Sequence, residues 1–154
     1  MRTSVITALV LIGLGATMFV QAQEKKLERK DLPAAVRTAV DRESGGATVK
    51  GFSTERENGI RTYEAEMMVD GHSKDISMDV AGNVLEVEEQ VAFESLPASV
   101  RTSLTNLAGS GKITKVESLT KKGKLVAYEA AVKSGTKHRE FQVGPNGEKL
   151  KREE

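Results

Sequence analysis

The stretch Leu32-Pro33-Ala34-Ala35-Val36-Arg37-Thr38 returns later in the chain as Leu96-Pro97-Ala98-Ser99-Val100-Arg101-Thr102. Six of these seven positions are identical, at an offset of 64 residues. Further matches follow in the same order: Tyr63-Glu64-Ala65 with Tyr128-Glu129-Ala130, Gly59 with Gly123, Gly71 with Gly135, and residues 82–89 with residues 147–154. Agreement at several places in one order indicates an internal duplication, which has to be recognised before other patterns are interpreted.

Each copy of the duplicated unit is predicted to open with a helix. Pro33 and Pro97 suit the first helical position, where a missing N–H costs nothing. Asp31 and Ser95, two residues earlier, are the expected caps of the exposed backbone donors. Apolar residues then recur at helical spacing, and glycines are expected to end both helices. The predicted apolar stripes are Leu32, Val36 and Val40 in the first copy and Leu96, Val100, Leu104 and Leu107 in the second.

Four strands are predicted after each helix. Residues 48–55 are rich in strand-forming residues and lead to Asn58-Gly59, a strong hairpin signal. The later segments alternate between apolar and polar residues, as half-buried strands do. The predicted inward residues are Tyr63, Ala65, Met67, Val69, Ile76, Met78, Val80, Leu85 and Val87 in the first copy, and Tyr128, Ala130, Val132, Phe141, Val143 and Leu150 in the second.

The fold class that follows is α+β. Short turns make the strands antiparallel neighbours, and the apolar stripe of the helix and the apolar face of the sheet must bury each other. We therefore predict two tandem modules, each a helix plus a four-stranded antiparallel sheet, with the order α-β-β-β-β twice. The sequence leaves open whether the two sheets join edge to edge or pack as separate units.

The N-terminus predicts export from a bacterial cell. Arg2 precedes an apolar stretch, residues 5–20, and Ala22 provides a small residue before the expected cleavage point. A retained N-terminal anchor is the alternative, although the apolar stretch is short for a membrane span. The expected organisation is a signal peptide (1–22), a charged linker (23–30), the first copy (31–90), a linker (91–94) and the second copy (95–154). A periplasmic or secreted protein follows, with no membrane association after cleavage.

The charge balance differs between the two copies. Residues 31–90 carry 6 basic and 13 acidic residues, whereas residues 95–154 carry 12 basic and 6 acidic residues. Opposite charges either aid docking of the two copies or are drift; the sharper interpretation is that one charged sheet is presented to a partner. The mature chain is balanced overall, so nothing favours nucleic acid as a partner.

Residue types exclude several kinds of site. The chain has no cysteine, which excludes disulfides, a lipoprotein anchor and thiol catalysis. His72 and His138 have no ligand partner three or four residues away and are interpreted as surface histidines. No nucleophilic serine motif occurs, and Gly109-Ser110-Gly111-Lys112 lacks the spacing of a phosphate loop. We expect no enzymatic activity, no metal and no cofactor.

The polar side of the first copy's sheet is the candidate partner-binding face. It carries six carboxylates: Glu64, Glu66, Asp75, Asp79, Glu86 and Glu88. The simplest interpretation is a solvated sheet surface, in which the carboxyl groups have no contrasting environments to separate their pKa values. A partner-binding or weak cation-binding face is the alternative.

An export signal followed by tandem units opening with Leu-Pro-Ala-x-Val-Arg resembles the PepSY-like family, and most of all its β-lactamase-inhibitor-like branch. The Tyr-Glu-Ala motifs and the closing Asp79-Val80-Ala81-Gly82-Asn83-Val84-Leu85-Glu86 carry the resemblance, which covers about residues 31–154. The resemblance implies secreted or periplasmic proteins that bind other proteins, peptidases included, without catalysis. The related β-lactamase inhibitor has disulfides and aromatic anchors that this sequence lacks, so β-lactamase inhibition is not expected.

Two functions therefore remain from the sequence. The first is an exported, non-catalytic binding or regulatory module that interacts with, or inhibits, a peptidase or another envelope protein. The alternative is a periplasmic protein that responds to a small ligand or a divalent cation through the acidic sheet face of the first copy. The sequence identifies neither the partner nor the oligomeric state.

Overall fold

The computed structural model describes residues 25–57 and 59–150, so the predicted signal peptide lies outside the described residues. None of the helices within those ranges is long and apolar enough to span a membrane. The elements follow in the order β1 (Lys25–Leu27), η1 (Arg29–Asp31), α1 (Ala34–Ser44), β2 (Thr48–Glu57), β3 (Ile60–Val69), β4 (His72–Met78), β5 (Val84–Gln90), η2 (Phe93–Ser95), α2 (Ala98–Ala108), β6 (Lys112–Lys121), β7 (Lys124–Ser134) and β8 (Lys137–Val143).

Both α-helices begin directly after a proline, Pro33 or Pro97. Neither helix start has a side-chain cap, so the prediction that Asp31 and Ser95 cap these helices is wrong. These two residues belong instead to the short 3-10 turns before the prolines, where each side chain bonds a backbone group of its own turn. The end of α1 is as predicted, with Gly45 in the left-handed conformation at φ 52°.

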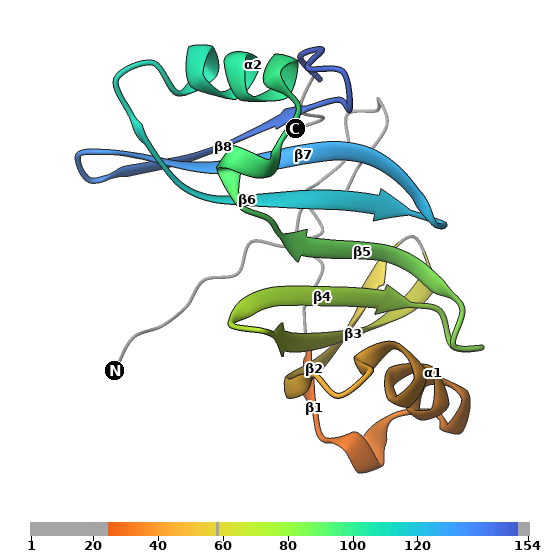
Figure 1. The fold of residues 1–154 in the computed structure, drawn as a ribbon. Coiled ribbons are helices and arrows are strands. Elements are labelled where there is room, and N and C mark those ends of the chain that lie inside the picture. Colours follow the sequence, from red (N-terminus) through yellow and green to blue (C-terminus); the bar gives the residue numbers. More distant parts are fainter. Residues whose placement is uncertain (1–24, 58, 151–154) are drawn as a thin grey trace.

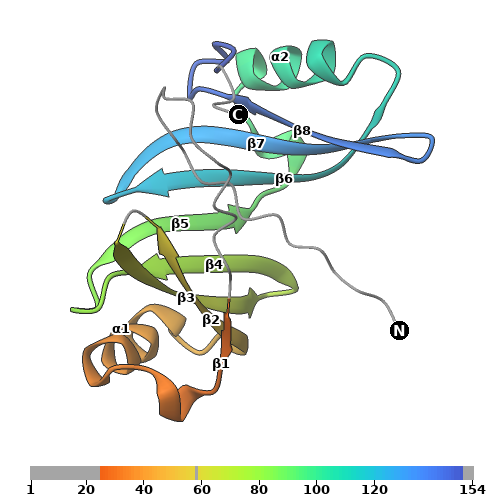
Figure 2. The ribbon, with the colours of Figure 1, turned by 180° about the vertical axis from the view of Figure 1, so that it is seen from behind.

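All the strands described form one antiparallel sheet in the order β1 to β8 (Figure 1). The two copies meet at the β5–β6 pair, the seam, where Glu86 faces Lys121 and Gln90 faces Glu117. Seen from behind, the sheet runs without interruption from β4 to β7 (Figure 2). The copies are therefore joined edge to edge, which answers the question that the sequence left open.

Strand β5 has a role in both copies. It is the last strand of the first copy, and it also covers the first edge of the second copy's sheet. Strand β1 covers the first copy in the same way, because Leu27 of β1 faces Phe52 of β2. The equivalent residues of the second copy lie 64 positions later, and there the Val91 N–H donates a hydrogen bond to the Val116 carbonyl at 2.9 Å. Each helix is thus preceded by a strand that pairs with the strand following that helix.

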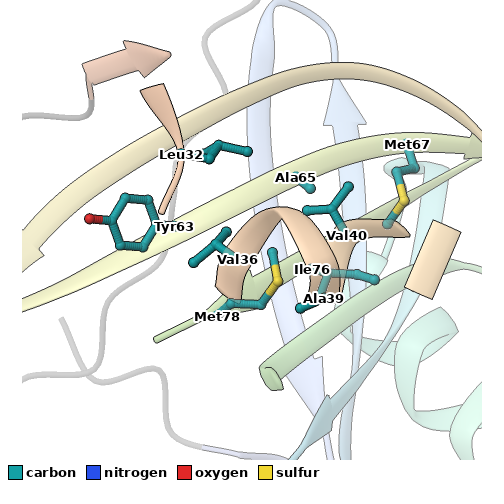
Figure 3. Close-up of a cluster of buried hydrophobic side chains, with 9 residues drawn as sticks. All are labelled: Leu32, Val36, Ala39, Val40, Tyr63, Ala65, Met67, Ile76 and Met78. Carbon is teal, nitrogen blue, oxygen red and sulfur yellow. The ribbon is translucent and has the colours of Figure 1, made fainter. Parts of the chain in front are cut away.

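The hydrophobic core consists of two clusters, one beneath each α-helix. Figure 3 shows how α1 lies over the strands of the first copy, with side chains from both interleaved. The buried members are Leu32, Val36, Ala39, Val40, Tyr63, Ala65, Met67, Ile76 and Met78 in the first cluster, and Leu96, Val100, Leu104, Val116, Ala130 and Val143 in the second. Fully burying one large apolar side chain contributes about 1.5–3 kcal/mol, so packing holds both helices in place.

The turn that ends the third strand of each copy is packed against the helix. Gly82 and Gly147 occupy equivalent places at φ 77° and 87°. A Cβ atom on Gly82 would lie 2.5 Å from the Ala35 carbonyl oxygen, and one on Gly147 would lie 2.7 Å from that of Ser99. Only glycine fits this approach of turn to helix, in addition to the backbone conformation.

Two details of the predicted strands need correction. Val80 does not point into the core but is 59% exposed, because β4 ends at Met78 and Val80 already belongs to the turn. Because of a register shift next to Met78, Val84 packs together with Val87 against the first core cluster. Alternation along the strand had predicted Leu85 in the place of Val84. A bulge of this kind changes which residues face inward.

The predicted fourth strand of the second copy is described only at its beginning. Lys149 forms an isolated bridge with Val143 of β8. Residues 151–154 lie outside the described part of the chain. Within that part, the architecture is α+β with two α-helices and one eight-stranded antiparallel sheet.

Candidate functional site

Both α-helices cover the same face of the sheet, which we call the helix face. Ile76 lies in the core under α1 and faces Val87 of β5, and Val87 in turn faces Thr120 of β6. These three side chains therefore lie on the same face of the sheet. Thr120 shares its side of β6 with Val116, which lies in the core under α2. The opposite face, the open face, is covered by no helix of the described chain.

The open face gathers carboxylates from both copies. Alternation along strands β3 to β8 places eight of them there: Glu64, Glu66, Asp75, Glu86, Glu88, Glu117, Glu129 and Glu140. Three of these come from the second copy, which is basic overall. Lys115 and Lys121 lie among them on β6. The net charges of the copies therefore do not describe the charge of this face.

Three carboxylates stand side by side across neighbouring strands. Glu66 of β3 faces Asp75 of β4, and Asp75 faces Glu88 of β5. Like charges directly opposite one another on a sheet are destabilising. A row of three such groups is therefore costly for the fold unless protons, cations or a partner reduce the repulsion.

Glu117 brings the second copy into this group. One carboxylate oxygen each from Asp75, Glu88 and Glu117 lies within 4.8 Å of the others, and we call these three residues the acidic cluster. Glu117 is only 8% exposed. Its carboxylate lies 2.8 Å from the Lys115 ammonium and accepts a bond from the Ser73 hydroxyl at 3.4 Å. Glu117 is not among the predicted site residues, because it belongs to the copy that is basic overall.

Burial and repulsion change the acidity of Glu88. The pKa of this carboxyl group is raised from 4.5 to about 8, mainly because the group is buried. The negative charges of Glu86, Glu117 and Glu129 act in the same direction, as does a hydrogen bond with Glu86. Glu88 therefore holds its proton at a pH where an exposed glutamate is fully ionised.

Asp75 is affected in the same way, but less strongly. Burial raises its pKa from 3.8 to about 6, with further increases from the charges of Glu117 and Glu66. The Lys115 ammonium lowers this pKa and so offsets part of the effect. The expectation that a solvated face offers no contrasting carboxyl environments is wrong for Asp75 and Glu88.

The remaining predicted residues have different surroundings. Glu64 faces Ser77 of β4, whereas Glu66, two residues further along β3, faces Asp75 of the acidic cluster. Glu86 forms an ion pair across the seam with the Lys121 ammonium, at 3.2 Å. Asp79 lies outside the strands, in the β4–β5 turn, where its carboxylate accepts the N–H groups of Ala81 and Asn83 at 2.9 and 3.0 Å. Hydrogen bonds from Asn83 are also the main cause that lowers the pKa of Asp79. Asp79 thus shapes a turn and is not part of the open face.

The chemistry available to the acidic cluster is that of oxygen ligands. Three carboxylates close together can share protons or hold a hard divalent cation such as Ca²⁺. Among the described residues, no other group of three acidic or histidine side chains lies this close together. His72 is the first residue of β4 and His138 is the second residue of β8, and neither belongs to the cluster.

A second surface feature lies on the outer side of α2. It is a shallow hollow of about 490 Å³ lined chiefly by Phe93, Glu94, Arg101, Thr102, Thr105 and Asn106. The Arg101 guanidinium donates to the Glu94 carbonyl at 3.0 Å, so part of its donor capacity is used within the chain. The hollow offers no grouping of ionisable side chains comparable to the acidic cluster.

Comparison with known proteins gives relatives in structure but not in sequence. No family model matches the chain, and no curated protein does. A BLIP-like protein from Bacteroides fragilis is 22% identical with a TM-score of 0.57, over 77% of this chain and 84% of that one. A DUF2874 family protein from Bacteroides ovatus is 16% identical with a TM-score of 0.61, over 78% and 85%. A protein from Bacteroides eggerthii described as periplasmic is 14% identical with a TM-score of 0.64, over 78% and 86%. These likenesses show that the chain shares their fold.

Proposed function

We propose that this chain is an exported, non-catalytic binding protein of the bacterial envelope that recognises a partner protein through the open face of its sheet. The observation that carries the proposal is the placement of both α-helices on one face, which leaves a polar face spanning both copies. Peptidases and other envelope proteins are the partner classes that the PepSY-like resemblance suggests.

The residues of the open face support binding better than catalysis. The Ser73 hydroxyl contacts Glu117 of the acidic cluster, but this hydrogen bond is long, at 3.4 Å, and the same carboxylate is paired with the Lys115 ammonium at 2.8 Å, so Glu117 is a weak base for activating that hydroxyl. A rigid sheet holds its side chains in fixed positions, and this reduces the entropy lost when a partner binds. The fold shared with a BLIP-like protein and with a protein described as periplasmic agrees with an envelope location.

Binding to native envelope proteins tests the proposal. The mature chain, residues 23–154, is immobilised and titrated with envelope extract, and a captured protein is then purified and titrated alone. Charge reversal at the open face, Glu64→Lys with Glu66→Lys, is expected to weaken saturable binding at least about ten-fold, because interface charges determine partner choice. Charge reversal in the hollow beside α2, Arg101→Glu, is the matched control and is expected to leave binding unchanged.

Two results would contradict a binding role for the open face. One is the absence of saturable binding to any envelope protein. The other is a captured protein that binds the Glu64→Lys, Glu66→Lys variant as tightly as the unmodified chain, while Arg101→Glu weakens binding. The second result would move the binding surface to the helix side of the molecule.

A divalent-cation response is the second candidate function, and the acidic cluster favours it. Asp75, Glu88 and Glu117 each offer an oxygen ligand, and their mutual repulsion would be reduced by a bound cation. Calorimetry with CaCl₂ and with MgCl₂ tests this candidate directly. Heat of binding that disappears in Glu88→Gln, but persists in the exposed control Glu94→Gln, supports it; no heat and no thermal shift remove it.

A further inference from the structure

A row of basic side chains crosses the open face in the second copy. Lys112 of β6 faces Lys133 of β7, and Lys133 faces His138 of β8. We call these three residues the basic row. They lie on the open face, because the neighbouring pair of Ile113 and Val132 points into the helix side of the sheet and side chains alternate along each strand. All three side chains of the basic row are exposed.

The fold itself does not require this row. The equivalent positions of the first copy, 64 or 65 residues earlier, are Thr48, Met68 and Ser73, which pair in the same register without a charge. Like charges directly opposite one another on a sheet are destabilising. None of the three residues of the basic row forms an ion pair with another residue of the described chain. A negatively charged group from outside these residues would therefore relieve the repulsion.

The basic row borders the carboxylates of the open face. Glu129 lies four residues from Lys133 along β7, which corresponds to about 13 Å, and Glu140 lies two residues from His138 along β8. A protein interface of standard size covers about 800 Å² of each partner, so one docked protein reaches charges of both signs. A uniformly anionic surface, such as a lipid bilayer, fits this face less well, because it would place its negative charges against eight carboxylates.

We propose that the partner protein of the open face presents carboxylate side chains to the basic row and basic side chains to the carboxylates next to it. This inference rests on the proposed function and specifies the chemistry of the partner. Carboxylates that meet lysine ammonium groups form charge-assisted hydrogen bonds. Opposite charges at two places of one interface determine the direction in which the partner lies across the sheet. Binding thus depends on the order of the charges as well as on their number.

Two synthetic peptides test whether the order of charges matters. The block peptide consists of three glutamates, one glycine and three lysines, so the centres of its two charged blocks are about 13 Å apart when the peptide is extended. The mixed peptide has the same composition with alternating charges. In an NMR titration of the chain of residues 23–154, the block peptide is expected to bind at least about ten-fold more tightly. Equal affinity of the two peptides, or no binding of either, overturns the proposal.

A matched pair of variants assigns the binding to the basic row. Lys133→Met introduces the uncharged residue type that the first copy has at the equivalent Met68. Lys137→Met removes the same charge from the same hairpin, but Lys137 is exposed on the helix face. Lys133→Met is expected to weaken binding of the block peptide about five-fold or more, and Lys137→Met to leave it unchanged. Equal losses would mean that only net charge matters and would overturn the proposal.

A purified envelope partner separates this inference from the proposed function. Lys133→Met is expected to weaken its binding about five-fold or more. If Lys133→Met has no effect while Glu64→Lys with Glu66→Lys weakens binding, the open face binds the partner and only this inference fails. If neither variant weakens binding, the proposed function fails as well. Vesicles of phosphatidylglycerol test the lipid alternative: saturable binding to them that Lys133→Met weakens, but Lys137→Met does not, assigns the basic row to a membrane and overturns the proposal.

Discussion

Glu88 of the first copy and Glu117 of the second bring carboxylate oxygens to within 4.8 Å of each other across the seam. This contact arises because β5 and β6 pair with Gln90 opposite Glu117 and Glu88 opposite Leu119, so both glutamates lie on the open face. Two copies of opposite net charge thus place like charges together where they join.

The first prediction is that stability falls as the pH rises from about 4 to 8. The folded chain holds protons on Asp75 and Glu88 up to pKa values of about 6 and about 8, above the ordinary 3.8 and 4.5. The native state therefore binds more protons than the unfolded state in this range, and the free energy of unfolding decreases with rising pH. The stabilisation that the protonated Asp75 and Glu88 side chains contribute is complete below their ordinary pKa values of 3.8 and 4.5. It is lost as the pH rises through the raised pKa values of about 6 and about 8.

Glu88→Gln isolates this effect, because glutamine keeps the shape but cannot ionise. We expect the variant to exceed the unmodified chain in free energy of unfolding by about 1–2 kcal/mol at pH 8, and the difference to shrink towards zero at pH 4. Urea unfolding at both pH values measures it. A difference that is the same at pH 4 and pH 8 would show that ionisation of Glu88 does not affect folding.

The second prediction concerns the turn that packs on α1. Gly82 and Gly123 both have φ 77°, but a Cβ on Gly82 would meet the Ala35 carbonyl, whereas one on Gly123 would meet nothing within 4 Å. Gly123→Ala is expected to cost about 1 kcal/mol from backbone strain alone, and Gly82→Ala about 3 kcal/mol or more. Thermal and urea unfolding measure both. Equal costs would mean that the turn does not need to approach the helix so closely.

The third prediction is that the two copies unfold together. Met78 is fully buried in the first core cluster, and Met78→Ala is expected to cost about 2–5 kcal/mol. Because β5 is shared, this loss should lower the unfolding midpoint of both copies equally. The chain has two tyrosines, one in each copy, and no tryptophan, so Tyr63→Phe and Tyr128→Phe each leave one fluorescent reporter. A Met78→Ala chain in which the Tyr128 signal keeps its original midpoint would show that the copies unfold independently.

The fourth prediction concerns the ion pair that crosses the seam. Lys121 and Glu86 are both partly exposed, so replacing Lys121 by Met is expected to change the free energy of unfolding by less than about 1 kcal/mol. Unfolding in low and high salt measures the effect, which screening should reduce further. A cost above about 2 kcal/mol would mean that charge, more than the hydrogen-bonded strand pair, holds the copies together.

Local patterns in the sequence predict most of the elements correctly. The repeated Leu-Pro starts, the apolar spacing and the turn glycines locate both helices and the strand order, since each depends on neighbouring residues. The misplaced Val80 and Leu85 show where this reasoning fails. A bulge beside Met78 depends on how β4 and β5 fit together, which alternation along one strand cannot reveal.

The acidic cluster could be predicted only in part. Its members Asp75 and Glu88 follow from alternation within the first copy. The membership of Glu117 could be predicted only if the pairing of β5 with β6 were known. This pairing joins the two copies, and the sequence offers no local signal for it. Burial is the main cause of the raised pKa values of Asp75 and Glu88, and the charge of Glu117, which this contact supplies, raises both further.

The most direct test is a pH titration of Glu88 in the folded chain of residues 23–154, monitored through the ¹³C chemical shift of its side-chain carboxyl carbon. The burial of Glu88 and its contact with Glu117 across the seam predict a midpoint of about 8. A midpoint near the ordinary 4.5 would mean that Glu88 is a solvated surface residue. The repeats would then carry no shared acidic cluster on the open face.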